Sequence, residues 1–188
     1  MTNIKIKPEG KVEVDSLPKL IQYNYAVDWD LYGIEWGLEH YAESYGLDLN
    51  PDFQRGHVWT MEQRIKFMEY VVKGGKVYAP IIFNSPAFGG FTKQKDADLD
   101  DTIIIVDGLQ RLTTMRMFMA NEIAIFGGYK LNDFDKPRLI TRTNHFRVAV
   151  NTLQSRKELL QFYVELNEGH IAHSSEEIDR VKGLISEL

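Results

Sequence analysis

The sequence predicts an α+β fold, and three observations lead to this prediction. Short runs rich in β-branched residues, such as Thr102 to Val106, have the length and composition of strands. Longer stretches repeat their apolar residues with a helical period. The two kinds of segment do not alternate as regular strand–helix–strand units. At 188 residues with 44% hydrophobic content, the chain has the size of one domain and enough apolar residues for a core.

The first fifty residues are predicted to contain a hairpin, a helix and a short strand. Apolar residues alternate on both sides of the turn-like segment Pro8–Gly10, which indicates two short strands: Ile4, Ile6, Val12 and Val14. Apolar residues from Leu31 to Tyr45 follow helical spacing, with Asp30 as the predicted N-cap and Gly46 as the stop. Leu47–Leu49 is expected to form a short strand.

The middle of the chain is predicted to contain a helix, a strand and a long loop. Thr60 and Gln63 have the spacing of a capping box, so a helix is expected to begin there and end near Gly74. Its expected buried residues are Ile65, Met68 and Val72. Val77 to Phe83 predicts a strand, and Pro80 predicts an edge position or a bend, because proline lacks a backbone donor. Asn84 to Asp101 is expected to be a loop.

The second half is predicted to hold a central helix, a strand and two final helices. The helix runs from about Leu109 to Ile123, and its expected buried residues are Leu112, Met115, Met119 and Ile123. The alternation from Phe146 to Val150 predicts a strand. Capping-box spacing at Ser155 with Glu158, and again at Ser174 with Glu177, predicts the two final helices.

Charge and composition narrow the classes of function. The net charge is −5 and the isoelectric point is near 5.6, which argues against a broadly basic, nucleic-acid-binding surface. One local basic cluster is a candidate for nucleic-acid contacts: Lys136, Arg138, Arg142 and Arg147. The chain has no cysteine and no run approaching the ~18 apolar residues of a membrane span. We therefore expect a soluble cytoplasmic protein with no membrane partner and leave its oligomeric state open.

The segment Asp107–Arg111 is the main candidate site. It follows an apolar strand and precedes a helix, so Gly108 is expected to make a tight strand-to-helix turn. Such a turn directs backbone N–H groups and the positive end of the helix at one spot, which suits a phosphate. Asp107 would orient a metal-bound or attacking water. The candidate phosphate-binding residues of this segment and of the first helical turn after it are Gly108, Gln110, Arg111, Thr113 and Thr114.

A structural alternative stays open for the same segment. Asp107 and Gln110 also have capping-box spacing, so both side chains could simply close the helix. A second candidate segment is Asn50–Arg55, where Gln54 and Arg55 offer hydrogen-bonding groups side by side. Beside the glycine turn, Arg55 would add a second cation to the anion site, whereas the alternative is an ordinary surface ion pair.

Other catalytic arrangements are not indicated. The histidines lack the spacing of a metal site, so no resident metal is expected; they include His57, His145, His170 and His173. Neither a Walker-type phosphate loop nor the elbow of a serine hydrolase is present. Trp29 and Trp36 are candidates for a docking surface, although their helical surroundings favour core packing.

Taken together, the two candidate segments resemble a known family. Asn50–Trp59 and Val106–Thr113 are similar to the paired motifs of the domain-of-unknown-function family 262, found at the N-terminus of GmrSD-type modification-dependent restriction enzymes. Tyr163–Gly169, with the following Ser174 and Glu177, is similar to the family's asparagine–glycine turn and next helix. The resemblance covers about residues 25–188, leaves residues 1–24 as an N-terminal extension, and is greatest to short stand-alone members from phages and bacteria.

The resemblance implies a ParB/sulfiredoxin-like fold, a small mixed sheet flanked by helices, that binds a nucleoside triphosphate with or without Mg²⁺. The residues that match the family's Asp-Gly-Gln-Gln-Arg motif are Asp107, Gly108, Gln110 and Arg111, and those that match the upstream motif are Gln54 and Arg55. Asp107, Gln110 and Arg111 would be the catalytic residues. Leu109 replaces the first glutamine of the motif, so binding is expected and hydrolysis stays open. The missing cysteine excludes sulfiredoxin chemistry.

Three functions therefore remain. The first is nucleoside-triphosphate binding or hydrolysis in phage or defence-related DNA metabolism, for which Arg111→Ala is expected to abolish binding and leave the fold intact. The second is DNA binding or nicking through the cluster from Lys136 to Arg147. Because the chain lacks the His-Asn-His nuclease domain that the restriction enzymes carry, this would need a partner or a weaker ParB-like nuclease activity. The third is a non-catalytic module, such as a phage factor that binds a host protein in the host cytoplasm.

Overall fold

The α+β class is confirmed. The computed structural model describes residues 5–9, 11–12, 22–54, 59–92, 97–168 and 175–187. Its strands are β1 (Tyr25–Asp30), β2 (Leu47–Asp48), β3 (Val77–Asn84), β4 (Ile103–Asp107) and β5 (His145–Asn151). They form one mixed sheet in the order β1-β5-β3-β4-β2. β3 runs parallel to β5, while the pairs β1–β5 and β3–β4 are antiparallel and β2 runs parallel to β4.

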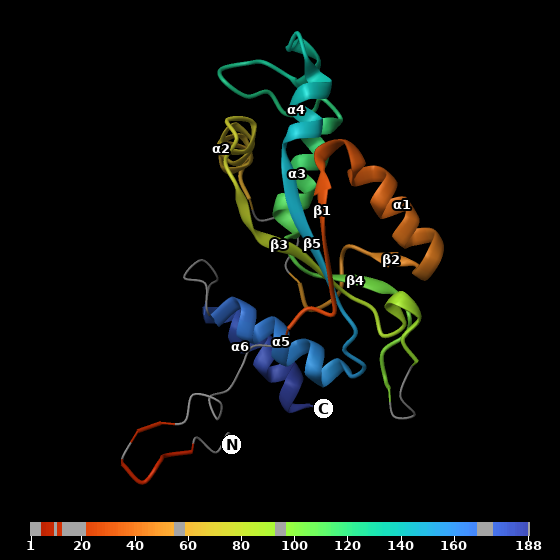
Figure 1. Ribbon diagram of the computed structural model, residues 1–188, viewed down its shortest axis with the longest axis vertical. Helices are drawn as coiled ribbons and strands as arrows, with labels where there is room; N and C mark the ends of the chain where they lie inside the picture. Colours follow the sequence, from red (N-terminus) through yellow and green to blue (C-terminus); the bar gives the residue numbers. More distant parts are fainter. Residues whose placement is uncertain are drawn as a thin grey trace.

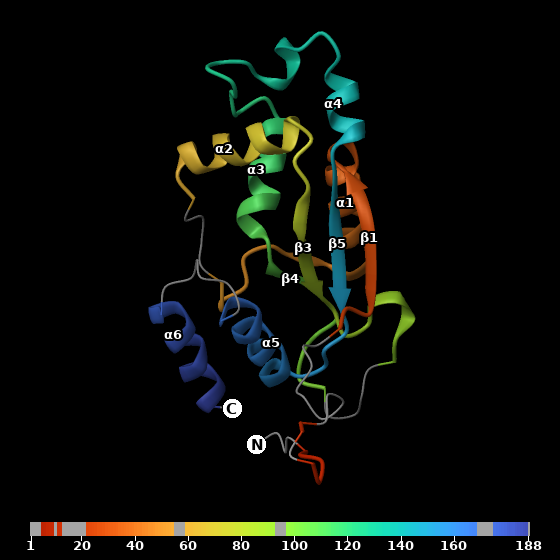
Figure 2. The ribbon, with the colours of Figure 1, turned by 60° about the vertical axis from the view of Figure 1, so that its left-hand side comes forward.

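The helices cover the sheet in two groups. They are α1 (Ile34–Tyr45), α2 (Met61–Val72), α3 (Leu109–Met119), α4 (Pro137–Thr143), α5 (Arg156–Glu168) and α6 (Ser175–Ser186). In Figures 1 and 2, α5 and α6 lie together near the end of the sheet at which β5 finishes, and α1, α2 and α3 lie toward the other end. The start of α3 is therefore the part of its group that lies nearest to α5 and α6.

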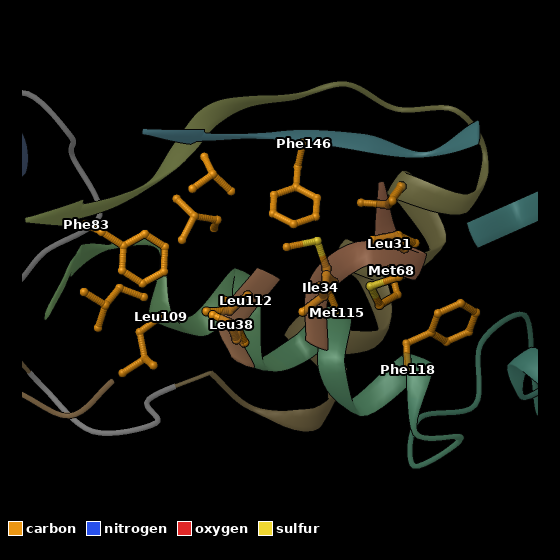
Figure 3. Close-up of a cluster of buried hydrophobic side chains, with 14 of the residues drawn as sticks. Leu31, Ile34, Leu38, Met68, Phe83, Leu109, Leu112, Met115, Phe118 and Phe146 are labelled. Carbon is orange, nitrogen blue, oxygen red and sulfur yellow. The ribbon is translucent and has the colours of Figure 1, made fainter. Parts of the chain in front are cut away.

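The sheet separates two apolar clusters because neighbouring strand residues face opposite sides. Ile81 and Phe83 of β3 belong to the larger cluster with α1, α2 and α3, part of which Figure 3 shows. Ile82, between them in sequence, belongs to the smaller cluster with α5 and α6, which also contains Phe53. Phe53 directly precedes Gln54, so the second cluster holds the upstream motif against the sheet.

Several predicted ends and strands are confirmed. Thr60 and Gln63 form the predicted capping box at the start of α2, and Gly46, with a φ of 76°, follows the last residue of α1. Asp30 accepts a hydrogen bond from Gly33 N at 2.7 Å, and a short 3₁₀ turn, Leu31–Gly33, precedes α1. Glu158 N donates to Ser155 Oγ at 3.2 Å beside the start of α5. Ser174 lies outside the described residues.

The N-terminal hairpin is confirmed in part. Ile6 and Val12 form an isolated antiparallel bridge. Ile4 and Val14, the outer residues of the predicted hairpin, lie outside the described residues.

Three predictions about elements need correction. The edge position considered for Val77 to Phe83 is wrong, because β3 lies in the middle of the sheet; the predicted bend is present as a register shift between Val77 and Ile81. The helix predicted to reach Ile123 ends at Met119, although Ile123 is buried. β1 and α4 were not predicted. The signal for β1 is the alternation of Tyr25, Val27 and Trp29, and the signal for α4 is a proline in its first turn.

Candidate functional site

The turn between β4 and α3 has the predicted strand–glycine–helix geometry. Gly108 is the N-cap of α3, and its φ of 94° lies in the left-handed region. A Cβ atom there would lie 2.6 Å from Ile81 Cδ1 and 3.1 Å from Arg111 Nη2. Glycine is therefore required both for the backbone conformation and for the close approach of α3 to β3.

The capping alternative for Asp107 and Gln110 is wrong. The Asp107 carboxylate binds the Arg111 side chain, at 2.5 Å from Oδ2 to Nη2. The Gln110 carboxamide oxygen accepts from Trp59 N at 3.2 Å. Neither side chain closes the start of α3, and the N-cap residue is a glycine with no side-chain hydrogen bond. The backbone donors of the first turn of α3 are thus not capped by the residues that the spacing suggested.

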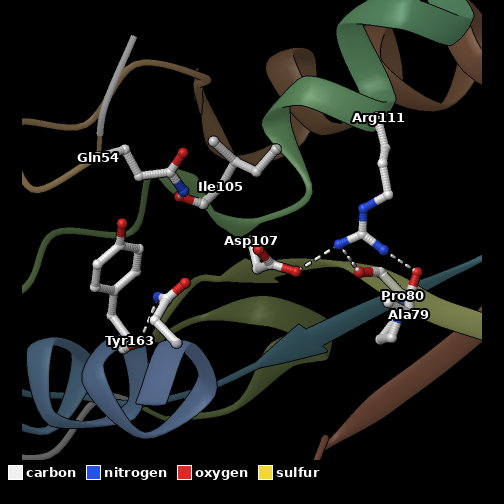
Figure 4. Close-up of polar contacts among 8 residues, drawn as sticks. Gln54, Ala79, Pro80, Ile105, Asp107, Arg111 and Tyr163 are labelled. Carbon is white, nitrogen blue, oxygen red and sulfur yellow. Dashed lines mark hydrogen bonds and ion pairs between the residues drawn. The ribbon is translucent and has the colours of Figure 1, made fainter. Parts of the chain in front are cut away.

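Arg111 links α3 to β3. Its guanidinium group donates to the carbonyl oxygens of Ala79 and Pro80, the latter at 3.2 Å, as well as to Asp107 (Figure 4). These carbonyls lie within the register shift of β3, where regular pairing with β5 is interrupted. Because Arg111 holds two elements together, its replacement will also lower stability. The expectation that Arg111→Ala leaves the fold intact is therefore not supported by these contacts.

The upstream motif lies against the same turn. Gln54 Nε2 donates to Ile105 O of β4 at 2.7 Å, and Trp59 N donates to Gln110 Oε1 of α3. Arg55 itself lies outside the described residues. The residues on either side of 55–58 are thus anchored beside the β4–α3 turn, although they are 51 positions away from their partners in sequence.

Arg64 is a residue of this site that the sequence analysis missed. It lies on α2 with only 5% of its surface exposed. Its Nη1 donates to Thr114 Oγ1 at 3.0 Å and its Nη2 to Gln110 Oε1 at 3.3 Å. The Thr114 hydroxyl, completely buried, also donates to Gln110 O at 2.6 Å. The Thr114 side chain therefore contacts α2 and its own helix, whereas Thr113 is partly exposed. An arginine on an amphipathic helix gives no sequence signal of burial.

Helix α5 contributes further side chains near the same turn. Tyr163 packs its ring against Phe53 with a centroid separation of 5.3 Å, and its carbonyl oxygen accepts from Asn167 Nδ2 at 2.6 Å. Figure 4 draws Tyr163 on α5 on the side of α5 that faces Gln54 and Asp107. The buried Asn167 falls within the tail that resembles the family, but it was not predicted as a residue of the site.

Tyr23, from the predicted N-terminal extension, lies close enough to the candidate site for the charges of Asp107 and Arg111 to affect its phenol. Its backbone neighbour Asn24 donates to Val150 O at 3.1 Å and accepts from Thr152 N at 2.9 Å, which continues the pairing of β1 with β5. Burial raises the pKa of the Tyr23 phenol, the charge of Asp107 raises this pKa further, and Arg111 lowers it. Tyr23 is therefore electrostatically coupled to the candidate site.

The basic cluster is partly neutralised in the fold. Arg147 pairs with Asp28 (Nε to Oδ1, 2.9 Å) and Arg142 pairs with Asp30 (Nη1 to Oδ2, 3.0 Å). The hydrogen bond from Arg147 lowers the pKa of the Asp28 carboxyl. Both acids come from β1, because the sequence between Lys136 and Arg147 itself contains no acidic residue. The other two members, Lys136 and Arg138, are exposed.

The two tryptophans have different environments. Trp29 packs against Tyr41 and Phe146, at centroid separations of 5.4 and 6.3 Å. Trp36 is 73% exposed and stacks on His40. The core packing favoured for both residues is therefore wrong for Trp36.

The fold and the paired segments describe an α+β domain in which two sequence motifs meet at a strand–glycine–helix turn. A family model described as the GmrSD restriction endonuclease, N-terminal domain, matches residues 38–185. The match covers most of the chain, and the chain belongs to this family. No curated protein and no solved structure matches it. β1 and Tyr23 precede the matched range.

Two further findings concern the described residues alone. They contain no group of three or more histidine and acidic side chains placed to hold a metal ion. None of their helices is long and apolar enough to cross a membrane.

Proposed function

We propose that this domain binds a nucleoside triphosphate at the turn between β4 and α3. The observation that carries the proposal is the pair of hydrogen bonds, from Gln54 to Ile105 and from Trp59 to Gln110, that anchors the upstream motif beside this turn. If either motif served only to cap a helix or to fill the core, the two motifs would not need to lie side by side. Two adjoining sets of backbone and arginine donors are best suited to bind a polyanion.

Three groups support binding of the phosphates. Gly108, the N-cap of α3, provides no side-chain cap, so the start of α3 presents the positive end of the helix dipole to a ligand. Arg64 supplies a buried positive charge behind α3, and its hydrogen-bond acceptors, Gln110 Oε1 and Thr114 Oγ1, are neutral oxygens. Arg55 would add a second arginine from the anchored segment. Arg111 is paired with Asp107 and would act mainly by holding the turn in shape.

Hydrolysis is a separate question from binding. Leu109, which stands where the family's motif carries glutamine, is only 6% exposed and belongs to the larger apolar cluster. Its side chain therefore offers no polar group for positioning water. Asp107, with 32% of its side chain exposed, is the carboxylate of the turn that would orient water or a nucleotide-bound Mg²⁺. We propose binding as the primary function and hydrolysis as an activity that depends on Asp107.

The test is a melting-temperature screen of the full chain with ATP, GTP, CTP and UTP, with and without Mg²⁺. A ligand that binds only the native state raises the melting temperature by mass action. Calorimetric titration of the best nucleotide should then show weaker binding to Arg55→Ala and Gln110→Ala. Arg116→Gln is the matched control, because Arg116 lies on the same helix and pairs with Glu35 at 2.6 Å. No shift with any nucleotide, or unchanged affinity in both variants, would contradict the proposal.

DNA binding through the basic cluster is the weaker alternative. Two of its four cations, Arg142 and Arg147, are paired with carboxylates, which reduces the charge available for phosphates. Contact with the DNA backbone would make the affinity fall steeply as salt increases. The third alternative, a protein-interaction module, is favoured by the exposed Trp36.

A further inference from the structure

Arg64 combines burial, charge and neutral partners in an unusual way. Its side chain is almost completely enclosed, yet both acceptors that the structure gives it, Gln110 Oε1 and Thr114 Oγ1, are uncharged. Burying a guanidinium group without a neutralising carboxylate is costly. A residue kept at such a cost has a role that an apolar side chain in the same place would not fulfil.

The contacts of Arg64 determine the orientation of the Gln110 carboxamide. Gln110 Oε1 accepts two hydrogen bonds, from Trp59 N at 3.2 Å and from Arg64 Nη2 at 3.3 Å. A carboxamide oxygen has two lone pairs, so its capacity as an acceptor is filled. Rotating the amide by 180° would place its NH₂ group against two other donors. The amide is therefore held with its oxygen toward α2 and its Nε2 donors directed elsewhere.

Arginine is the side chain that can hold this arrangement. Gln110 and Thr114 are one turn apart on α3, and the two terminal nitrogens of Arg64 each bind one of them. A lysine at position 64 would keep the charge but offer a single nitrogen in place of the planar fork. Thr114 Oγ1 further ties the fork to the backbone of α3 through Gln110 O.

We propose that Arg64 is a positioning residue of the nucleotide site, which fixes the Gln110 carboxamide so that its Nε2 group donates to a phosphate oxygen. This inference rests on the proposed function, because it assigns a role at the same site. Arg64 itself stays behind α3 and need not touch the ligand. The lysine variant loses the fork and keeps the charge, whereas the glutamine variant loses both.

A nuclear magnetic resonance experiment on the full chain tests the orientation without any nucleotide. The side-chain NH₂ resonances of Gln110 should shift and exchange faster with solvent in Arg64→Lys and Arg64→Gln than in the unchanged protein. Gln63 is the internal control, because its carboxamide oxygen accepts from Thr60 N at 2.8 Å at the exposed start of α2. Unchanged Gln110 resonances in both variants would overturn the inference.

Nucleotide affinity tests the consequence for binding. We expect Arg64→Lys and Gln110→Ala each to weaken binding of the best triphosphate about tenfold, the size of one hydrogen bond to a charged group. The double variant should bind no more weakly than Gln110→Ala, because Arg64 acts through Gln110. Additive losses, or lower melting temperatures with unchanged affinity, would mean a merely structural role. If the unchanged protein binds no nucleotide, the proposed function fails, and the resonances still decide whether Arg64 orients Gln110.

Discussion

At the scale of single residues, the candidate site depends on three neighbours with different tasks. Gly108 allows α3 to begin against β3, Gln110 receives the anchored segment and Arg64, and Arg111 joins the helix to the break in β3. None of these side chains closes the helix, although the sequence spacing allowed that alternative. The N-cap of α3 is therefore a glycine without a side-chain cap, at the point where the two motifs meet.

Replacing Gly108 by alanine should lower the free energy of unfolding by about 2 kcal/mol or more, from backbone strain together with overpacking. The strain comes from the φ of 94°, and the overpacking from the approach to Ile81 Cδ1 at 2.6 Å. Gly74→Ala is the matched control, since Gly74 has a φ of 86° and nothing within 4 Å of its added Cβ. Chemical denaturation measures the free energy of unfolding of both variants. Equal decreases in the two variants would mean that the contact with Ile81 does not add to the destabilisation.

The pKa of the Tyr23 phenol should fall when Asp107 is replaced by asparagine. The negative charge of Asp107 disfavours the phenolate and so raises this pKa, and its removal reverses that effect while burial continues to raise the pKa. A titration of the tyrosine ring carbons by nuclear magnetic resonance measures the change. Asp133→Asn is the control, because Asp133 lies in a distant 3₁₀ turn, Leu131–Asp133. An unchanged Tyr23 pKa in Asp107→Asn would mean that the charge of Asp107 has no effect on Tyr23.

At the scale of elements, helix and strand positions are determined by close contacts between them. Gly37 lies in α1 where an added Cβ would come within 2.4 Å of the Trp29 ring on β1. Pro80 marks the break in β3 whose carbonyl groups bind Arg111. Glycine weakens a helix and proline weakens a strand, but here Gly37 lets α1 approach the Trp29 ring, and the break at Pro80 leaves carbonyl groups of β3 for Arg111.

Gly37→Ala should destabilise the protein even though alanine favours a helix by about 1 kcal/mol over glycine. Overpacking against Trp29 should outweigh this gain and lower the free energy of unfolding by about 1–2 kcal/mol net. Gly183→Ala in α6 should instead stabilise by about 0.5–1 kcal/mol, because nothing lies within 4 Å of its added Cβ. Denaturation curves of the two variants should shift in opposite directions, and a shift of both toward greater stability would contradict the prediction.

At the scale of the whole molecule, one sheet serves two apolar clusters. Ile81 and Phe83 face one cluster while Ile82 faces the other, so the three β3 residues couple the two helix groups. The candidate site lies between these groups, since Phe53 belongs to the smaller cluster and Leu109 to the larger one. Loss of either cluster would therefore disturb the upstream motif or the start of α3.

The two clusters should unfold in one cooperative transition, because they share the strands of the sheet. Phe118→Leu in the larger cluster and Phe162→Leu in the smaller one should each lower the free energy of unfolding by about 1 kcal/mol. Both side chains are almost fully buried. Scanning calorimetry should show a single peak that moves to lower temperature in each variant. Two resolved peaks, with each substitution moving only one of them, would contradict the coupling.

Much of the fold could be predicted where local chemistry decides it. Thr60 with Gln63 marked the start of α2, Gly46 marked the end of α1, and the β-branched run before Asp107 marked β4. The predicted strand–glycine–helix turn is present because only glycine allows its backbone conformation. β1 was missed because its alternating residues precede a stronger helix signal, and the middle position of β3 was missed because Pro80 favours an edge.

Local sequence patterns were enough to predict the two motifs, the glycine turn and the α+β class, since each depends on residues close together in the chain. What these residues contact depends instead on how distant segments meet in the folded chain. The tertiary structure brought Gln54 and Trp59 to the β4–α3 turn, buried Arg64 behind Gln110, and paired Arg142 and Arg147 with acids from β1. The physical reason is that these contacts join residues about 50 to 120 positions apart, and the order of strands in the sheet, which local patterns do not encode, determines which of them meet.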